Sequence, residues 1–258
     1  MRRGINVEHI DFEMFLDNTL KSYGYLFPET DEQMEVFEKT VELKELPLKF
    51  QNSSFVFDKN ISILSTRRCT DAERAIVAGH IINKCNTDDF GRVKFQKLLY
   101  LVEHVFQLDF DSNYERKAAG PHDHFLLSRI ETTLQQYHFY KIPQDNKDNR
   151  RVHYEPLSSA EELSDLFSAN FVREKDSIDQ FLSQFKKATW QQCEIVATLY
   201  AVWNNRIIRK QEISDILLKQ DFLDWDPHKA KYKDRIDRAL KWMKDKNIIP
   251  IGWGKAIK

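Results

Sequence analysis

Apolar side chains recur at spacings of three and four residues through most of this 258-residue chain, which is the period of an α-helix. The chain has only seven glycines and seven prolines, the residue types that most often end helices and form turns. Charged residues make up 31% and hydrophobic residues 41%, which supplies material for a core and argues against disorder. The sequence therefore predicts a mainly α-helical fold.

The length is compatible with one large domain or with two to three small ones, and we expect the small domains. Changes in the hydrophobic pattern divide the chain into four predicted parts. Residues 1–65 carry two amphipathic segments and predict an N-terminal helical unit. Residues 66–157 predict a central domain, residues 158–188 connecting helices, and residues 189–258 a separately organised C-terminal domain.

The central part begins with Thr70-Asp71-Ala72-Glu73, a capping-box pattern that predicts the start of a helix. A broad apolar face predicts a buried helix over residues 91–107, and helical spacing returns over residues 122–138. Between them, residues 113–121 are expected to be extended and to end in a Gly-Pro turn. Residues 139–142 and 151–154 flank a polar run, which predicts a β-hairpin.

The C-terminal part predicts helices over residues 190–208, 211–219 and 229–246. A strand-like tail with two glycines follows at residues 248–254. Three helices followed by a short ribbon is the order of a winged helix-turn-helix. We therefore expect a C-terminal winged-helix-like domain.

One motif in the central part is more specific than periodicity alone. The helix sequence Lys94-Phe95-Gln96-Lys97-Leu98-Leu99-Tyr100-Leu101 is followed by the turn Ala118-Ala119-Gly120-Pro121. This pairing resembles the Panacea, or SocA-like, antitoxin domain over about residues 70–155. The family pattern is a Lys-rich KLxKLLYxA helix followed by a Gly-Pro turn. The family turn is commonly followed by an apolar residue, whereas His122 follows it here.

The resemblance implies a domain of a bacterial conflict system that recognises a toxin or a partner subunit and has no established catalytic centre. The partner-binding residues that it implies are Lys94, Lys97, Tyr100, Gly120, Pro121 and His122. A wider likeness, over residues 90–254, is similar to extensions on restriction-modification specificity subunits. It includes the stretch from Ala197 to Asn204 and implies an accessory role in restriction or phage defence.

Two of these motif positions have alternative interpretations from their residues alone. Lys94 and Lys97 lie three apart on one helical face, beside an apolar stripe. They are expected either to form a solvated rim or to meet an acidic partner. Gly120-Pro121 is either a structural turn or part of a binding surface.

The C-terminus is strongly basic although the whole chain has a formal net charge of -1. From His228 onward there are ten Lys or Arg residues and three Asp residues, so phosphate is one expected partner. A winged helix would offer basic side chains to a groove and its wing to the backbone. The candidate DNA-binding residues are Lys231, Arg235, Arg238, Lys241, Trp253 and Lys255. The alternative is a solvated basic face on a protein-binding domain.

Residues suited to chemistry are few. His122, Asp123 and His124, with His104 and the pair Asp109 and Asp111 nearby in sequence, are the best metal or acid–base candidates. No established metal-ligand spacing accompanies them, and Asp123 also suits a helix N-terminus, so we expect no bound metal. The sequence has no glycine-rich phosphate loop or nucleophile elbow, so no cofactor and no catalytic residue is expected.

The three cysteines, Cys69, Cys85 and Cys193, are widely spaced and are expected to be reduced thiols that pack in the interior. The first residues lack the apolar stretch of a signal peptide, and no uninterrupted apolar segment is long enough to span a membrane, so we expect a cytoplasmic protein. The leading hypothesis is a non-enzymatic antitoxin or defence accessory subunit. The alternatives are a DNA-binding transcriptional regulator and a metal-dependent nuclease that uses His122 to His124.

Overall fold

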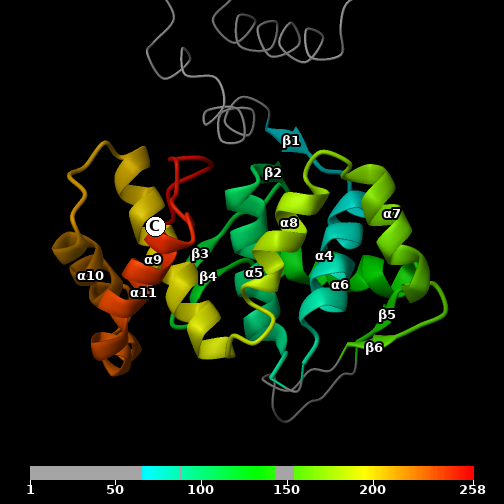
Figure 1. The fold of residues 1–258 in the computed structure, drawn as a ribbon, viewed down its shortest axis with the longest axis horizontal. Helices are drawn as coiled ribbons and strands as arrows, with labels where there is room; N and C mark the ends of the chain where they lie inside the picture. The colour runs from blue at the N-terminus through cyan, green and yellow to red at the C-terminus, as the bar shows by residue number, and fades with distance from the viewer. Residues whose placement is uncertain (1–65, 88, 143–153) are drawn as a thin grey trace, which may run out of the picture. The chain divides into compact units, whose positions relative to one another are not determined.

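The computed structural model describes residues 66–87, 89–142 and 154–258, drawn in colour in Figure 1. The predicted N-terminal unit over residues 1–65 and most of the predicted hairpin between residues 143 and 153 lie outside the described residues. The described part is mainly helical, as the sequence predicts. The described residues from Arg67 to Lys258 form one compact unit, and the boundaries predicted after residues 157 and 188 fall inside it.

The first described helix, α4 (Asp71–Cys85), begins at the predicted capping box. The Thr70 hydroxyl accepts a hydrogen bond from the Glu73 backbone N–H (3.2 Å), and Glu73 Oε2 accepts one from the Thr70 backbone N–H (2.9 Å). Each bond satisfies a donor that the helix cannot satisfy itself. Helix α4 packs against α6 (His124–Gln136), α7 (Leu163–Asn170) and α8 (Lys175–Ser183), and also against α5 (Arg92–Val105). The short 3₁₀ helix η3 (Ala160–Glu162) precedes α7.

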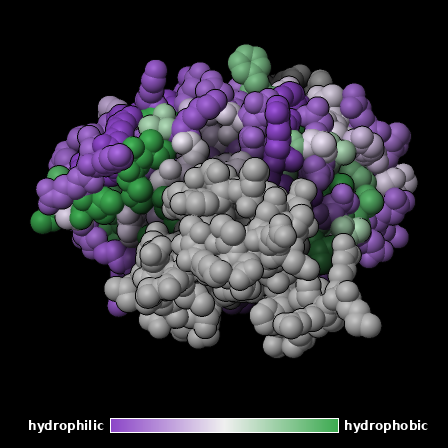
Figure 2. Space-filling model, turned by 90° about the horizontal axis from the view of Figure 1, so that it is seen from above, coloured by the Kyte–Doolittle hydropathy of each residue, from purple (hydrophilic) through white to green (hydrophobic). Residues whose placement is uncertain are grey.

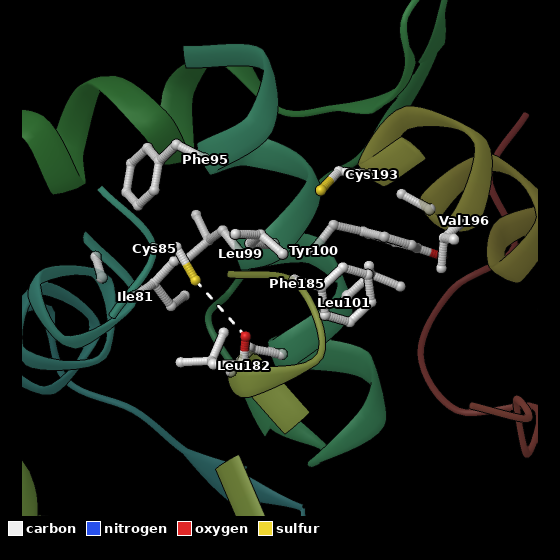
Figure 3. Close-up of a cluster of buried hydrophobic side chains, with 14 of the residues drawn as sticks. Ile81, Cys85, Phe95, Leu99, Tyr100, Leu101, Leu182, Phe185, Cys193 and Val196 are labelled. Carbon is white, nitrogen blue, oxygen red and sulfur yellow. Dashed lines mark hydrogen bonds between the residues drawn. The ribbon is translucent and has the colours of Figure 1, made fainter. Parts of the chain in front are cut away.

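Helices α5 (Arg92–Val105) and α9 (Trp190–Ile208) form the most extensive helix–helix contact of the described residues. Figure 3 shows the core at this contact, where Tyr100 of α5 lies near Cys193 and Val196 of α9. On the other side of α5, Cys85 at the end of α4 lies near Leu182. One continuous apolar core therefore runs through the segments that the sequence assigned to a central and a C-terminal domain.

The described residues form three small two-stranded sheets beside the helices. Strand β1 (Arg67–Arg68) pairs in parallel with β2 (Leu108–Asp109). Strands β3 (Glu115–Lys117) and β4 (Gly120–His122) form an antiparallel hairpin within the segment predicted to be extended. Strand β5 (Tyr140–Lys141) pairs antiparallel with β6 (Glu155–Pro156). The first strand of the predicted hairpin is therefore present, and its described partner strand lies just after the predicted residues 151–154.

The C-terminal segment differs from the prediction in its third helix and its tail. Helix α10 (Asp215–Asp224) begins after the Ser214 cap, and the expected long third helix is a 3₁₀ helix, η4 (Pro227–Arg235), followed by α11 (Ile236–Asp245). From residue 246 to residue 258 the described chain contains no strand. The winged-helix prediction is therefore not confirmed, because its β-ribbon is missing from this tail.

Asparagine side chains of α9 bind the backbone of the tail. The Asn204 amide donates to the Trp253 carbonyl (2.7 Å) and accepts from the Gly252 backbone N–H (2.9 Å). Asn205 makes the same pair of bonds with Ile257, at 2.9 and 2.8 Å. Side-chain amides thus replace the β-ladder that the alternating tail sequence suggested.

On the face seen in Figure 2, hydrophilic side chains predominate and hydrophobic ones appear between them in separate patches. Among the described residues, no helix has the length and apolar character needed to cross a bilayer.

Candidate functional site

The motif residues of α5 lie in the interior, which corrects the prediction that the two lysines form an exposed rim or meet an acidic partner directly. Lys94, Lys97 and Tyr100 are 1%, 0% and 1% exposed. Helix α5 is enclosed by α4, β2, β4 and α9, so the face beside its apolar stripe is covered as well. The Lys94 ammonium has no hydrogen-bond partner among the described residues, whereas Lys97 has one.

Lys97 joins the two halves of the motif. Its ammonium group donates a hydrogen bond to the carbonyl oxygen of Pro121 in β4. Gly120 has a φ of +96°, and a Cβ added there would lie 2.5 Å from Thr198 Oγ1 of α9. The position therefore requires glycine for both its backbone conformation and its close approach to α9. Gly120 and Pro121 lie at the start of β4, just after the turn at residues 118–119, so the predicted Gly-Pro turn is displaced by two residues. Both residues have a structural role, because they hold β4 between α5 and α9.

A buried ion pair lies next to this turn. Glu194 of α9 is 3% exposed and Lys229 of η4 is 0% exposed, and their Oε1 and Nζ atoms are 2.7 Å apart. Lys229 Nζ also donates to Thr198 Oγ1 (3.2 Å), and the Tyr232 hydroxyl donates to Glu194 Oε2 (3.3 Å). We call Lys97, Gly120, Glu194, Thr198 and Lys229 the buried polar cluster. Sequence reasoning missed Glu194 and Lys229, although a carboxylate within a strongly apolar helix was a signal for the first.

Burial shifts the proton affinities in and near this cluster. Desolvation, reinforced by the nearby Lys229 cation and opposed by Glu194, lowers the pKa of Lys97 to about 7. Desolvation raises the pKa of Glu103 to about 8 although Ser112 Oγ donates to Glu103 Oε1 at 2.7 Å. Burial lowers the pKa of His104 to about 3, and its Nδ1–H donates to the Tyr100 carbonyl (3.0 Å). His104 is therefore a neutral, packed histidine.

The His122-Asp123-His124 segment does not converge on a single point. Asp123 is buried and caps α6, with Oδ1 accepting from the Leu126 backbone N–H (2.9 Å) and Oδ2 from that of Asn113 (2.6 Å). His122 Nδ1–H donates to the side-chain oxygen of Gln96 (2.8 Å). In the described part of the chain, no group of three or more His, Cys, Asp or Glu side chains could hold a metal ion.

An exposed aromatic side chain follows this segment. Phe125 is 79% exposed, whereas the next two residues of α6, Leu126 and Leu127, are 1% and 5% exposed. The Phe125 ring lies 5.8 Å from the ring of His124, which in turn lies parallel to the ring of His122 at 6.3 Å. Three rings thus occupy the end of β4 and the first turn of α6.

The structure does not bring the six predicted DNA-binding residues into one set of contacts. Trp253 packs on His104 (5.2 Å between rings) and on Asn204, near the C-terminal end of α9. Arg235 and Arg238 instead line a pocket with Ile195. From Ile195 to Asn204, the distance along the helix axis is about 14 Å.

The other three predicted DNA-binding residues lie outside this pocket. Lys231 Nζ lies over the rings of Tyr232 (4.7 Å) and Trp190 (6.0 Å). Lys241 is exposed and pairs weakly with Asp245 one helical turn on (3.8 Å), and Lys255 is exposed in the tail.

The pocket that contains Arg235 and Arg238 has a volume of about 370 Å³. Its walls come from α9, from α11 and from the segment that follows α8. The residues that line it are Gln184, Phe185, Lys187, Ala188, Gln192, Ile195, Val196, Arg235, Arg238, Ala239 and Trp242. We call this pocket the α9–α11 groove.

The cysteines are interior packing residues. All three are buried, and burial raises the pKa of Cys69 and of Cys193 to about 12 and that of Cys85 to about 11. At neutral pH they are protonated thiols, and Cys193 lacks the thiolate character that a nucleophile needs.

No protein-family model, curated protein or solved structure matches this chain. The fold and the sites describe a mainly helical protein in which Lys97, Gly120 and Pro121 make buried contacts between α5, β4 and α9. Its candidate binding features are the exposed Phe125 ring and the α9–α11 groove with its basic rim.

Proposed function

We propose that this chain is a non-enzymatic, cytoplasmic partner-binding protein of a bacterial conflict system, either an antitoxin or an accessory subunit of a restriction or defence complex. The resemblance of Lys94 to Leu101 and of Ala118 to Pro121 to the Panacea domain supports this proposal. The single observation that carries it is the exposure of Phe125, directly after that motif, at 79%.

An exposed aromatic ring flanked by polar groups suits a protein interface. Aromatic side chains are enriched among the residues that contribute most to binding energy, because a large, rigid ring leaves water at a small entropic cost. Here the rings of His122 and His124 extend the surface of Phe125. Glu115, paired across the hairpin with His122, adds an exposed polar edge.

The buried motif residues would then position this surface. Lys97 holds the carbonyl of Pro121, and Gly120 packs on Thr198, so the end of β4 is fixed relative to α5 and α9. His122 is the one member of the predicted partner-binding set that reaches the surface at this end. We therefore assign contact to His122, His124 and Phe125, and positioning to Lys97, Gly120 and Pro121.

The test is co-expression of the full chain with the product of the reading frame adjacent to its gene. Phe125→Ser should reduce recovery of that product at least about tenfold, the effect of an interface residue that contributes about 1.4 kcal/mol or more. Val172→Ser is the matched control, because Val172 is 74% exposed at the α7–α8 connection, and it should leave recovery unchanged. Equal recovery with Phe125→Ser and with wild type would remove this surface from the proposal.

The alternative proposal is a DNA-binding transcriptional regulator that uses a winged-helix-like C-terminal segment. Its support is the excess of cations after His228. Binding of a duplex probe that weakens steeply with added salt would favour this alternative. The division of the predicted DNA contacts between two ends of α9 makes partner binding the stronger proposal.

A further inference from the structure

The walls of the α9–α11 groove are two helical stripes. Gln192, Ile195 and Val196 lie at relative positions 0, 3 and 4 on α9. Arg235, at the end of η4, and Arg238, Ala239 and Trp242 of α11 are spaced at 0, 3, 4 and 7. Residues at such spacing share one helix face. The groove therefore lies between two helices. A groove of this shape can bind an amphipathic peptide whose apolar side faces the groove.

The interior of the groove is apolar. The Phe185 and Trp242 rings meet edge to face with their centroids 5.5 Å apart and at 83°. Phe185 is 1% exposed, whereas Trp242 is half-buried, so part of the tryptophan remains open to an occupant. Ala188 and Ala239 leave space where larger side chains would fill the seam. An apolar side chain placed here would leave water with little rearrangement of the walls.

The rim of the groove is cationic. Lys187, Arg235 and Arg238 line it, and none of the described residues that line it is an Asp or a Glu. Within the described ranges none of the three forms an ion pair, although Arg235 lies over the Tyr232 ring at 5.6 Å. Their neighbours are paired: Lys219 binds Asp237 (2.6 Å) and Lys244 binds Asp215 (2.6 Å). Carboxylates from a ligand would complete the charge pattern of the groove.

The apolar interior indicates which kind of anion fits the groove. The phosphates of DNA gain nothing from contact with Trp242. An acidic peptide can carry an apolar side chain that is buried against this ring.

We propose that the α9–α11 groove binds an acidic peptide segment of a partner protein. An apolar side chain of the peptide inserts against Trp242, and its carboxylates pair with Arg235, Arg238 and Lys187. This site shares no residue with the Phe125 surface, and the proposal stands independently of the function proposed for that surface.

The experiment selects binders from a displayed library of random short peptides on the intact, full-length chain. Enriched peptides should combine Asp or Glu with an aromatic or branched apolar residue. A synthetic, labelled copy of the most enriched peptide is then titrated by fluorescence anisotropy. Arg238→Gln should weaken its binding at least about tenfold, and Ala239→Met, which fills the seam, should weaken it to a similar extent.

Lys241→Gln is the matched control, because Lys241 lies on the same helix, three residues from Arg238, and does not line the groove. It should bind the peptide as wild type does. A DNA-binding face would instead use Lys241 and Arg238 alike. The proposal is overturned if no acidic, apolar pattern is enriched, if Arg238→Gln binds as wild type does, if Lys241→Gln weakens binding equally, or if duplex DNA binds through Arg238. Circular dichroism of each variant confirms that the helices are retained.

Discussion

Cations lie next to two faces of helix α9, and they are paired at one face and, among the described residues, unpaired at the other. One face carries Glu194 and Thr198 into the buried polar cluster, where Lys229 has a carboxylate and a hydroxyl partner. The other face carries Ile195 and Val196 into the α9–α11 groove, where the cations of the rim have no carboxylate partner in the described part of the chain. The Glu194 carboxylate offsets part of the cost of burying the Lys229 cation, because desolvation disfavours an unpaired charge strongly. A cation at an open rim keeps its water and can remain available for a ligand.

This comparison separates structural from binding residues better than charge alone. The two lysines that the sequence placed on a partner surface are interior groups of α5. The two arginines that it assigned to DNA, Arg235 and Arg238, line a groove with an apolar interior. The predictions that follow test whether the cluster is structural and the groove is not.

The largest effect is expected from removing the carboxylate of the buried pair. Glu194→Ala leaves the Lys229 ammonium buried and unpaired, so the free energy of unfolding should fall by about 3–5 kcal/mol. The measurement is urea-induced unfolding followed by circular dichroism. The double variant Glu194→Met, Lys229→Met should recover much of this loss, because no uncompensated charge remains. A loss below about 1 kcal/mol in the single variant would show that the pair is not structural.

A smaller loss of folding stability is expected from a substitution at Gly120, the first residue of β4. Gly120→Ala forces an alanine into a φ of +96° and places its Cβ against Thr198 Oγ1, which should cost about 1–3 kcal/mol. Combining it with Thr198→Ala relieves the contact but not the backbone strain, so the two effects should not add. Strict additivity in thermal unfolding would contradict the close approach of the turn to α9.

Glu103 should make stability depend on pH. Its pKa is raised to about 8 in the folded chain, so between its unfolded value and pH 8 the folded state binds a proton that the unfolded state lacks. Stability from this group is therefore complete at low pH and is lost as pH rises towards 8, by up to about 1.4 kcal/mol for each pH unit. Glu103→Gln mimics the protonated acid, and its stability relative to wild type should increase from pH 5 to pH 8.

Lys97 provides the matched comparison for Glu103. Its pKa is lowered to about 7, so its contribution should change only above that pH, where stability increases as the unfolded state alone retains the proton. Lys97→Met should flatten the pH profile above pH 7 and leave the region below it unchanged. Identical profiles for wild type and for Glu103→Gln below pH 8 would contradict the burial of that carboxyl group.

The smallest effect is expected in the groove. Arg238 has no ion pair within the described ranges and is exposed, so Arg238→Gln should change the free energy of unfolding by no more than about 0.5 kcal/mol. The same variant is the one expected to weaken peptide binding. If Arg238→Gln lowered the free energy of unfolding as much as Glu194→Ala does, Arg238 would be a structural residue and the contrast between the two faces of α9 would be wrong.

Local signals in the sequence determined the start and type of most helices. The capping box at Thr70 begins α4, and the apolar period over residues 190–208 coincides with α9. The extended segment ending in Gly120-Pro121 is the β3–β4 hairpin. These features were predictable because capping, periodicity and turn formation depend on residues within a few positions of one another.

Only the tertiary structure decided which polar groups are buried and where the tail lies. Helix α9 covers the face of α5 that carries Lys97, and the partner of that lysine, Pro121, is 24 residues away. Asn204 and Asn205 bind the backbone of the tail across about 50 residues of sequence, at positions where the sequence suggested a strand of the wing. Burial depends on which distant segment packs over a helix. The hydrophobic period of a helix shows which face is apolar, but it does not specify which segment covers that face. The choice of segment depends on how well the side chains of the two surfaces fit together.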